Sequence, residues 1–337
     1  MANIGRLGLV QYVHSLHGSA TTNAIDYAAS YPIVQYLQDN RTEGWTHMAI
    51  QHAAQHGLLD AVQHLSRVQP EYCTRSAMDL AAANGHFKVV EYLGSERTDG
   101  CTTDAMDWAA ANGHEQVVRY LHFNRTEGCT TYAMDMAARN GHDNLVEFLH
   151  YNRTEGCTSN AMDFAARYGH ESIVRFLHEH RSEGCTTLAM DYASSNGQLA
   201  IVDFLHHHRT EGCTRNAKEW AATNGHLEMV KYLHSNRTED CRRLACTVAA
   251  ENGHLEVVRF LLNNRTEGCS ALGMYTAALN GDLEMVAYLW AACPDRYSDD
   301  HRVILRNAHH GKHQELFQYI NELKVDQRPP FISWSNE

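Results

Sequence analysis

Proline, positive charge and long apolar segments are all scarce in this sequence. Only 5 of the 337 residues are proline, and such a composition disfavours a long disordered region. The formal net charge is −12 with neutral histidines, which argues against a nucleic-acid partner because nucleic-acid-binding proteins usually present a basic surface. No apolar run approaches the length of a membrane span, so we expect no membrane partner.

Signals of secretion and of catalysis are also missing. The N-terminal residues lack the basic segment followed by an apolar segment that marks a secretory signal. We therefore expect an intracellular protein of the cytoplasm or nucleus. There is no Cys-x-x-Cys, no glycine-rich phosphate loop, no kinase signature and no nucleophile elbow.

The sequence has instead a regular repeat of 28 residues, marked by cysteine. The cysteines that keep this spacing are Cys73, Cys101, Cys129, Cys157, Cys185, Cys213, Cys241 and Cys269. A period between 20 and 50 residues is typical of solenoids, in which each repeat contacts only its neighbours. Serine, histidine and aspartate recur with the repeat, which argues against a unique catalytic site. We predict that the protein is not an enzyme and has no cofactor and no metal.

One repeat, residues 129–156, predicts two helices. We number its positions 1 to 28 from the cysteine. Thr130 or Thr131 can cap the first helix by accepting hydrogen bonds from backbone amides, and Asn140-Gly141 ends it because glycine readily takes the left-handed conformation. The second helix opens at His142. Its wider apolar face is formed by Leu145, Val146, Phe148 and Leu149.

The repeat resembles the ankyrin repeat. The resemblance lies in Ala105-Met106-Asp107-Trp108-Ala109-Ala110, followed by Gly113-His114 and Val117-Val118, against the family pattern Thr-Pro-Leu-His-x-Ala-Ala, Gly-His and Val-Val. Ala and Asp replace the family's Pro and His, and the repeat has 28 residues where 33 are usual. The combination Arg-Thr-Glu-Gly-Cys-Thr with Ala-Met-Asp is similar to short ankyrin units of oomycete proteins.

The resemblance implies an all-α, right-handed ankyrin-type α-solenoid of stacked helix–turn–helix repeats, with short loops and little or no β-hairpin. We divide the chain into four parts. Residues 1–19 form a half-repeat, which is either a cap or the remainder of repeats lost upstream. Residues 20–296 hold ten ankyrin-like repeats, residues 297–324 form degenerate capping helices, and residues 325–337 form a flexible tail. In the first of these repeats, Pro32 suits the first turn of the second helix.

The repeated cysteines, histidines and arginines have structural interpretations. Equivalent cysteines of stacked helices lie roughly 8–10 Å apart, too far for a disulfide or a shared zinc ion, so we expect small buried thiols in a reducing compartment. We expect the histidines that follow the turn glycine, such as His142, to make turn hydrogen bonds. The histidines that end the second helix, such as His150, stand at a helix C-terminus, where a positively charged side chain is favourable. The arginine at position 25, such as Arg125, pairs either with the aspartate at position 7 or with a loop glutamate.

Positions 4, 8 and 11 of the first helix vary between repeats and share one helical face. In ankyrin proteins the matching face lines the concave groove that binds partners. Position 8 carries aromatic residues or Met, which are enriched in interface cores; packing between repeats is the alternative role. The predicted partner-binding residues are Asp104, Trp108, Tyr132, Met136, Arg139, Asn160, Phe164, Arg167, Leu188, Tyr192, Asn216 and Trp220.

We therefore predict a monomeric, non-enzymatic scaffold that binds a partner protein through the concave first-helix face. One alternative is a targeting module of an enzyme whose catalytic domain is missing upstream or is a separate chain. A weaker alternative is a structural spacer.

Overall fold

The computed structural model describes residues 7–15, 21–239, 244–264, 268–297 and 300–322. By its contacts the chain divides into two compact units. Unit 1 contains residues 1–165 and 175–184, and unit 2 contains residues 166–174 and 185–337. The described residues form helices with short connections and include no β-strand, so the predicted all-α class with short loops is confirmed for this part of the chain.

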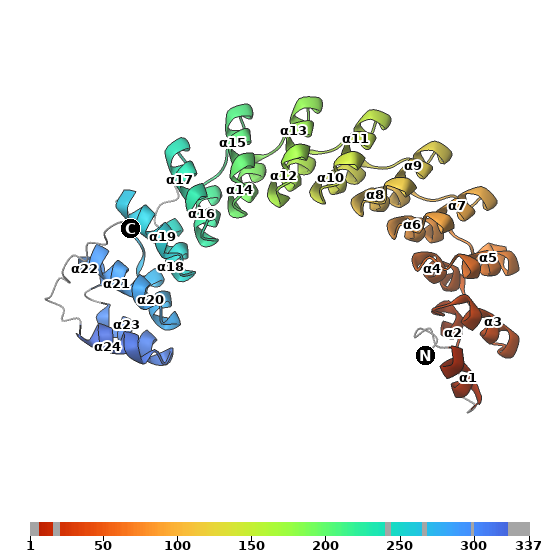
Figure 1. Ribbon diagram of the computed structural model, residues 1–337, viewed down its shortest axis with the longest axis horizontal. Coiled ribbons are helices and arrows are strands. Elements are labelled where there is room, and N and C mark those ends of the chain that lie inside the picture. Colours follow the sequence, from red (N-terminus) through yellow and green to blue (C-terminus); the bar gives the residue numbers. More distant parts are fainter. Residues whose placement is uncertain (1–6, 16–20, 240–243, 265–267, 298–299, 323–337) are drawn as a thin grey trace. The chain divides into compact units, whose positions relative to one another are not determined.

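The first helices of the repeats form one layer within each unit (Figure 1). They start and end as the sequence predicted: the Thr130 hydroxyl accepts a hydrogen bond from the Tyr132 N–H at 3.1 Å, and Gly141, after the last turn, has a φ of 76°. The helices of this layer are α4 (His47–Gln55), α6 (Arg75–Ala83), α8 (Thr103–Ala111), α10 (Thr131–Arg139), α12 (Ser159–Tyr168), α14 (Thr187–Ser195), α16 (Asn216–Thr223), α18 (Leu244–Glu251) and α20 (Ala271–Asn280).

The second helices form the other layer. Each begins directly after the Gly-His turn, or its counterpart, and packs on the first helix of its own repeat. The helices of this layer are α5 (Leu59–Val68), α7 (Phe87–Glu96), α9 (Glu115–Asn124), α11 (Asp143–Asn152), α13 (Glu171–His180), α15 (Leu199–His208), α17 (Leu227–Asn236), α19 (Leu255–Asn264) and α21 (Leu283–Ala292).

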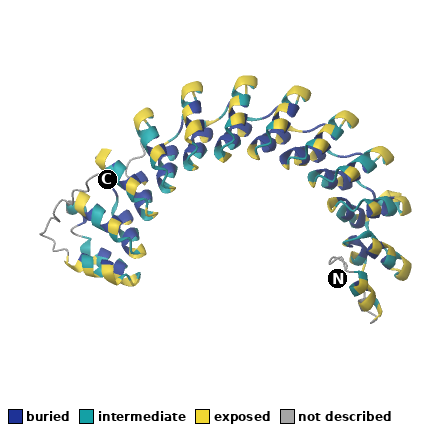
Figure 2. Ribbon diagram, viewed as in Figure 1, coloured by how far each residue is buried: buried dark blue, intermediate teal, exposed yellow. Residues whose placement is uncertain are grey.

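The core lies where the two layers meet and where neighbouring first helices touch, as the buried residues in Figure 2 show. Ala105, Ala109 and Ala110 are fully buried on α8, and Val118 and Leu121 are buried on α9. Alanine lets adjacent helix backbones approach closely, while the larger residues of the second helix fill the space between the layers. Figure 2 marks residues at the outer ends of the second helices as exposed.

The terminal elements depart from the regular hairpin. Before the first full repeat lie α1 (Leu7–Ser15), α2 (Asn23–Asp26) and α3 (Tyr31–Asn40), and Pro32 stands in the first turn of α3 as predicted. A short 3₁₀ helix, η2 (Pro70–Tyr72), precedes α6. After α21 follow α22 (Pro294–Tyr297), α23 (His301–His310) and α24 (Gln314–Glu322). The predicted tail at 325–337 lies outside the described residues.

Candidate functional site

Where position 7 is an aspartate, its carboxylate ties the first helix to the next repeat. The Thr130 N–H donates to Asp107 Oδ1 at 2.8 Å, and the Thr130 hydroxyl donates to Asp107 Oδ2 at 2.7 Å. Burial raises the pKa of the Asp107 carboxyl, and the two bonds from Thr130 oppose this shift. The same pair of bonds joins Asp26 to Thr46, Asp79 to Thr102, Asp135 to Thr158 and Asp191 to Thr214.

Arginine at position 25 pairs with the loop glutamate two residues later, which settles an alternative that the sequence left open. Arg125 Nη2 lies 2.6 Å from Glu127 Oε1, and the same oxygen accepts a hydrogen bond from the Cys101 N–H at 3.1 Å. The bond from Arg125 lowers the pKa of Glu127 to about 2. The pair thus closes the loop onto the start of its own repeat, and pairing of this arginine with the aspartate at position 7 was the wrong alternative.

Histidine at position 14 bonds to the preceding repeat, whereas the sequence predicted a bond within the turn. His142 Nε2 donates to the carbonyl oxygen of Ala111, the last residue of α8, at 3.2 Å. Asn140 Nδ2 donates to the same oxygen at 2.7 Å. The His142 ring therefore covers the turn at Gly113, where a Cβ atom would lie 2.7 Å from the imidazole Cε1.

Histidine at the end of the second helix packs on the next repeat. The His122 ring meets the Phe148 ring edge-on, with centroids 5.4 Å apart, and His150 meets Phe176 in the same way. Burial lowers the pKa of His150. Beside these histidines, Phe123 and Tyr151 are among the most exposed large apolar side chains of the described residues, at 70% and 66%.

The cysteine column is mostly buried thiol, with one correction. The free, buried members are Cys73, Cys101, Cys129, Cys157 and Cys213, and burial raises the pKa of Cys101 to about 12, so the reactive thiolate is scarce at neutral pH. Cys269, however, forms a disulfide with Cys246, with their Cα atoms 5.2 Å apart.

The expectation of a free thiol at every column position was therefore wrong at Cys269. The spacing argument applied only to equivalent positions, but Cys246 stands at position 6, where most repeats have Met. At this junction position 6 lies beside position 1 of the following repeat, so a cysteine at each can meet.

In unit 1 most of the variable positions lie on the surface of the first helices, and Met136 and Ala111 are buried exceptions. Trp108 and Tyr132 are exposed at 38% and 46%, whereas Met136 is only 9% exposed and lies under Arg139. Because it is buried, Met136 packs within the fold, as the alternative role for position 8 proposed. Asp104, Arg139 and Asn160 are exposed and Phe164 is half-buried, with the Arg139 guanidinium 5.8 Å from the Phe164 ring centroid.

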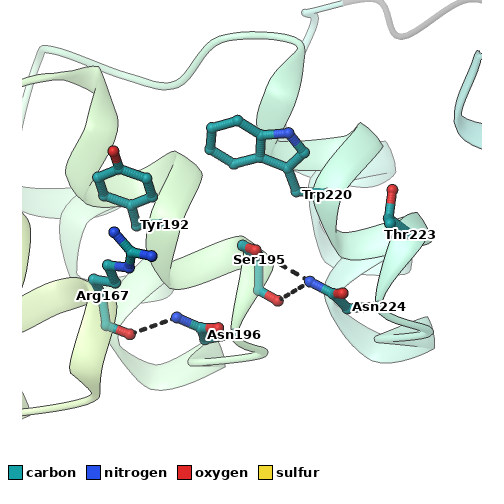
Figure 3. A pocket seen from close by; sticks show the side chains of 7 residues that line it. All are labelled: Arg167, Tyr192, Ser195, Asn196, Trp220, Thr223 and Asn224. Atoms are coloured by element: carbon teal, nitrogen blue, oxygen red, sulfur yellow. Dashed lines mark hydrogen bonds between the residues drawn. The ribbon is translucent and has the colours of Figure 1, made fainter.

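In unit 2 three variable side chains stack in a row (Figure 3). The Arg167 guanidinium lies 4.6 Å from the Tyr192 ring centroid. The Tyr192 and Trp220 rings stack with centroids 5.8 Å apart and planes 11° from parallel. All three are half-buried, as is Asn216, while Leu188 is exposed. Tyr192 has two stacking partners, Arg167 and Trp220, yet all three side chains stay partly exposed, so packing and binding are compatible roles here.

This row borders a pocket of about 240 Å³. Besides Arg167, Tyr192 and Trp220, the pocket is lined by Ser195, Asn196, Thr223 and Asn224. These four residues were not among the predicted binding residues. Ser195 and Thr223 occupy the variable position 11, so their variability could have identified them from the sequence. The asparagines at position 12 were attributed to the turn.

Two kinds of feature, a metal-binding group and a membrane-spanning helix, are absent from the described residues. No group of three or more histidine, cysteine, aspartate or glutamate side chains there has a geometry suited to a metal ion. Among the helices of the described residues, none combines the length and the apolar character that crossing a membrane requires.

Comparison with known families agrees with this architecture. A family model described as ankyrin repeats (3 copies) matches the chain at residues 50–135, 134–219 and 218–300. The protein therefore belongs to the ankyrin-repeat family, whose members generally serve as protein–protein interaction modules and are typically non-enzymatic. A search of curated proteins gives no significant match.

Proposed function

We propose that this protein is a non-enzymatic scaffold that binds a partner protein through the surface of its first helices. The observation that carries the proposal is the side-chain set at positions 4, 8 and 11. These positions change from repeat to repeat, while the positions that bond neighbouring repeats keep the same residue in most repeats, such as aspartate at position 7. Tyr132 and Trp108 in unit 1 and Tyr192 and Trp220 in unit 2 give this surface the aromatic content that is enriched in interface cores.

The neighbouring bonds support a surface whose side chains are free to vary. The bonds of Asp107 with Thr130 and of His142 with the Ala111 carbonyl hold adjacent repeats together without using the side chain of any variable position. A change at position 4 or 8 therefore alters what the surface recognises without removing these bonds. We expect the partner to be a protein rather than a nucleic acid, and we expect the chain to act as an intracellular monomer.

A paired substitution tests this proposal. Trp108→Ala combined with Trp220→Ala should abolish capture of the partner in affinity purification, because truncating aromatic anchors removes most of an interface's binding energy. Helical circular dichroism and the melting temperature should stay near those of the wild type. Equal loss of folding and of capture would show that these rings serve packing and would contradict the proposal.

The second helices provide a matched control. Phe123→Ala combined with Tyr151→Ala removes two aromatic rings that are more exposed than Trp108 but stand on the other layer. Capture should survive this double change. Loss of capture in the control variant alone would show that the binding surface lies on the second helices. A captured enzyme would favour the targeting-module alternative.

A further inference from the structure

The pocket beside Arg167 differs in charge from the protein as a whole. The chain carries a net charge of −12, yet the seven residues that line this pocket include one arginine and no acidic residue. The Arg167 guanidinium pairs with no carboxylate among the described residues, and it lies instead near the rings of Tyr192 and Tyr168. The loop arginines, such as Arg125 and Arg237, are each paired with a glutamate.

Hydrogen bonds hold the backbone of the pocket in place. Asn196 Nδ2 donates to the carbonyl oxygen of Arg167 at 2.7 Å, and Asn224 Nδ2 donates to that of Ser195, also at 2.7 Å (Figure 3). These bonds fix the ends of α12 and α14 that carry Arg167 and Ser195. A site whose backbone is already ordered loses less entropy when it binds.

Several side chains around the pocket have hydrogen-bond donors that no described residue accepts. The Ser195 hydroxyl accepts a hydrogen bond from Asn224 at 3.1 Å, so its own hydrogen remains available. The Tyr192 hydroxyl and the Trp220 indole N–H have no acceptor among the described residues. Together with the Arg167 guanidinium, these groups favour a ligand that accepts several hydrogen bonds and carries negative charge.

The volume of the pocket favours a side chain over a free small molecule. About 240 Å³ is below the range of roughly 300–1,000 Å³ that is common for small-molecule sites. The stacked rings of Tyr192 and Trp220 lie beside the cation and stay partly exposed, and their exposed parts suit an apolar side chain next to the negatively charged one.

We propose that this pocket binds the carboxylate of an aspartate or glutamate in a peptide segment of the partner, with a neighbouring apolar residue packed on Tyr192 and Trp220. This inference rests on the proposed function, because it assigns the first-helix surface of unit 2 a ligand of defined chemistry. Arg167 supplies the charge-assisted hydrogen bonds and Ser195 supplies a further donor. The two rings select the apolar neighbour.

A random 12-residue peptide library displayed on phage, selected on the immobilised full chain, tests the proposal. Enriched peptides should share an acidic residue beside an apolar one. For a synthetic peptide of that sequence, Arg167→Gln should weaken binding by about tenfold to a hundredfold, since a hydrogen bond to a charged group is lost. Replacing the peptide's acid by its amide should cost about as much in the wild type and little in Arg167→Gln.

A matched arginine and a charge reversal sharpen the test. Arg119→Gln removes an arginine of the second-helix layer, on α9, and should leave the affinity unchanged. Arg167→Glu should reject the acidic peptide and accept the version with lysine in its place. Circular dichroism checks that each variant keeps its helices.

The outcomes separate this inference from the proposed function. If binding falls with Trp220→Ala but not with Arg167→Gln, the carboxylate assignment is wrong while the first-helix surface stands. If selected peptides bind equally well to the Trp108→Ala and Trp220→Ala double variant, the proposed function fails as well. Enrichment of peptides without acidic residues, or no enrichment at all, would overturn the inference.

Discussion

The bonded positions and the variable positions of each repeat differ in how their side chains are used. At the bonded positions 2, 7 and 14, and at the position-13 glycine that lies beneath the next repeat's position-14 side chain, similar contacts recur at several junctions, as Asp107 with Thr130 and Asp191 with Thr214 show. At the variable positions 4, 8 and 11 one repeat presents Trp108 and another Tyr192. On the proposed function, the difference teaches that stability and recognition are assigned mostly to separate residues of one helix, so each can be changed alone.

The strongest test of the bonded positions is Gly113→Ala. Gly113 has a φ of 80°, and its new Cβ would overlap the His142 ring. The backbone strain and the overpacking together should lower the free energy of unfolding by about 2–5 kcal/mol, measured by chemical denaturation.

Gly44→Ala is the matched control for this change. Gly44 also has a positive φ, of 71°, but no atom lies within 4 Å of the position of its Cβ. Gly44→Ala should lower the free energy of unfolding only through backbone strain, by about 1–2 kcal/mol. Equal losses at the two glycines would mean that the His142 contact contributes nothing.

The disulfide between Cys246 and Cys269 joins two neighbouring repeats covalently. Its removal by Cys246→Ser should lower the free energy of unfolding by about 3 kcal/mol, because the bond closes a 23-residue segment and restricts the unfolded chain. A reducing agent should lower the melting temperature of the wild type and leave Cys246→Ser unchanged. Alkylation and mass spectrometry that find both thiols free in the purified protein would contradict the bond.

Asp135→Asn tests the bonds between repeats directly. The carboxylate accepts both the N–H and the hydroxyl of Thr158, whereas an amide has only one oxygen to accept them. One buried donor then loses its partner, and the free energy of unfolding should fall by about 1–3 kcal/mol. Asp104→Asn, at an exposed variable position of unit 1, should leave stability unchanged. A similar loss at both positions would erase the contrast between bonded and variable positions.

The smallest effect is expected from the loop ion pair of Arg125 and Glu127. Glu127 has a folded-state pKa of about 2, which is below its ordinary value. The contribution of the ion pair to the free energy of unfolding is therefore present above about pH 4.5 and is lost as the pH falls towards 2. Glu127→Gln should therefore cost less than about 1 kcal/mol at pH 7, and the gap from the wild type should close in acid. A gap that is constant between pH 7 and pH 2.5 would refute this assignment.

The sequence predicted the features that depend on neighbouring residues in the chain. The Thr130 cap, the turn at Gly141 and Pro32 in the first turn of α3 are such features, because caps and turns form within a few residues. The repeat period also predicted that the hairpins stack, and the family match confirms the ankyrin fold.

The contacts between repeats could not be read from the sequence. Asp107 and Thr130 stand 23 positions apart and His142 and Ala111 stand 31 apart, so their meeting depends on the register of one hairpin against the next. The same register brings Cys246 to Cys269. At the candidate site, variability pointed to Arg167, Tyr192 and Trp220, but the pocket also needs Asn196 and Asn224, which recur in the turns of several repeats and so appeared structural.

The most direct test compares two adjacent residues of α14. Asp191 is fully buried and bonds to Thr214, while Tyr192 is variable and half-buried beside Trp220. The free energy of unfolding and the affinity for a selected acidic peptide are to be measured for Asp191→Ala and for Tyr192→Ala. We predict that Asp191→Ala lowers the free energy of unfolding more than Tyr192→Ala does. We predict that Tyr192→Ala lowers the affinity for the peptide more than Asp191→Ala does. The opposite assignment, or equal losses in both quantities, would contradict the separation of stability from recognition.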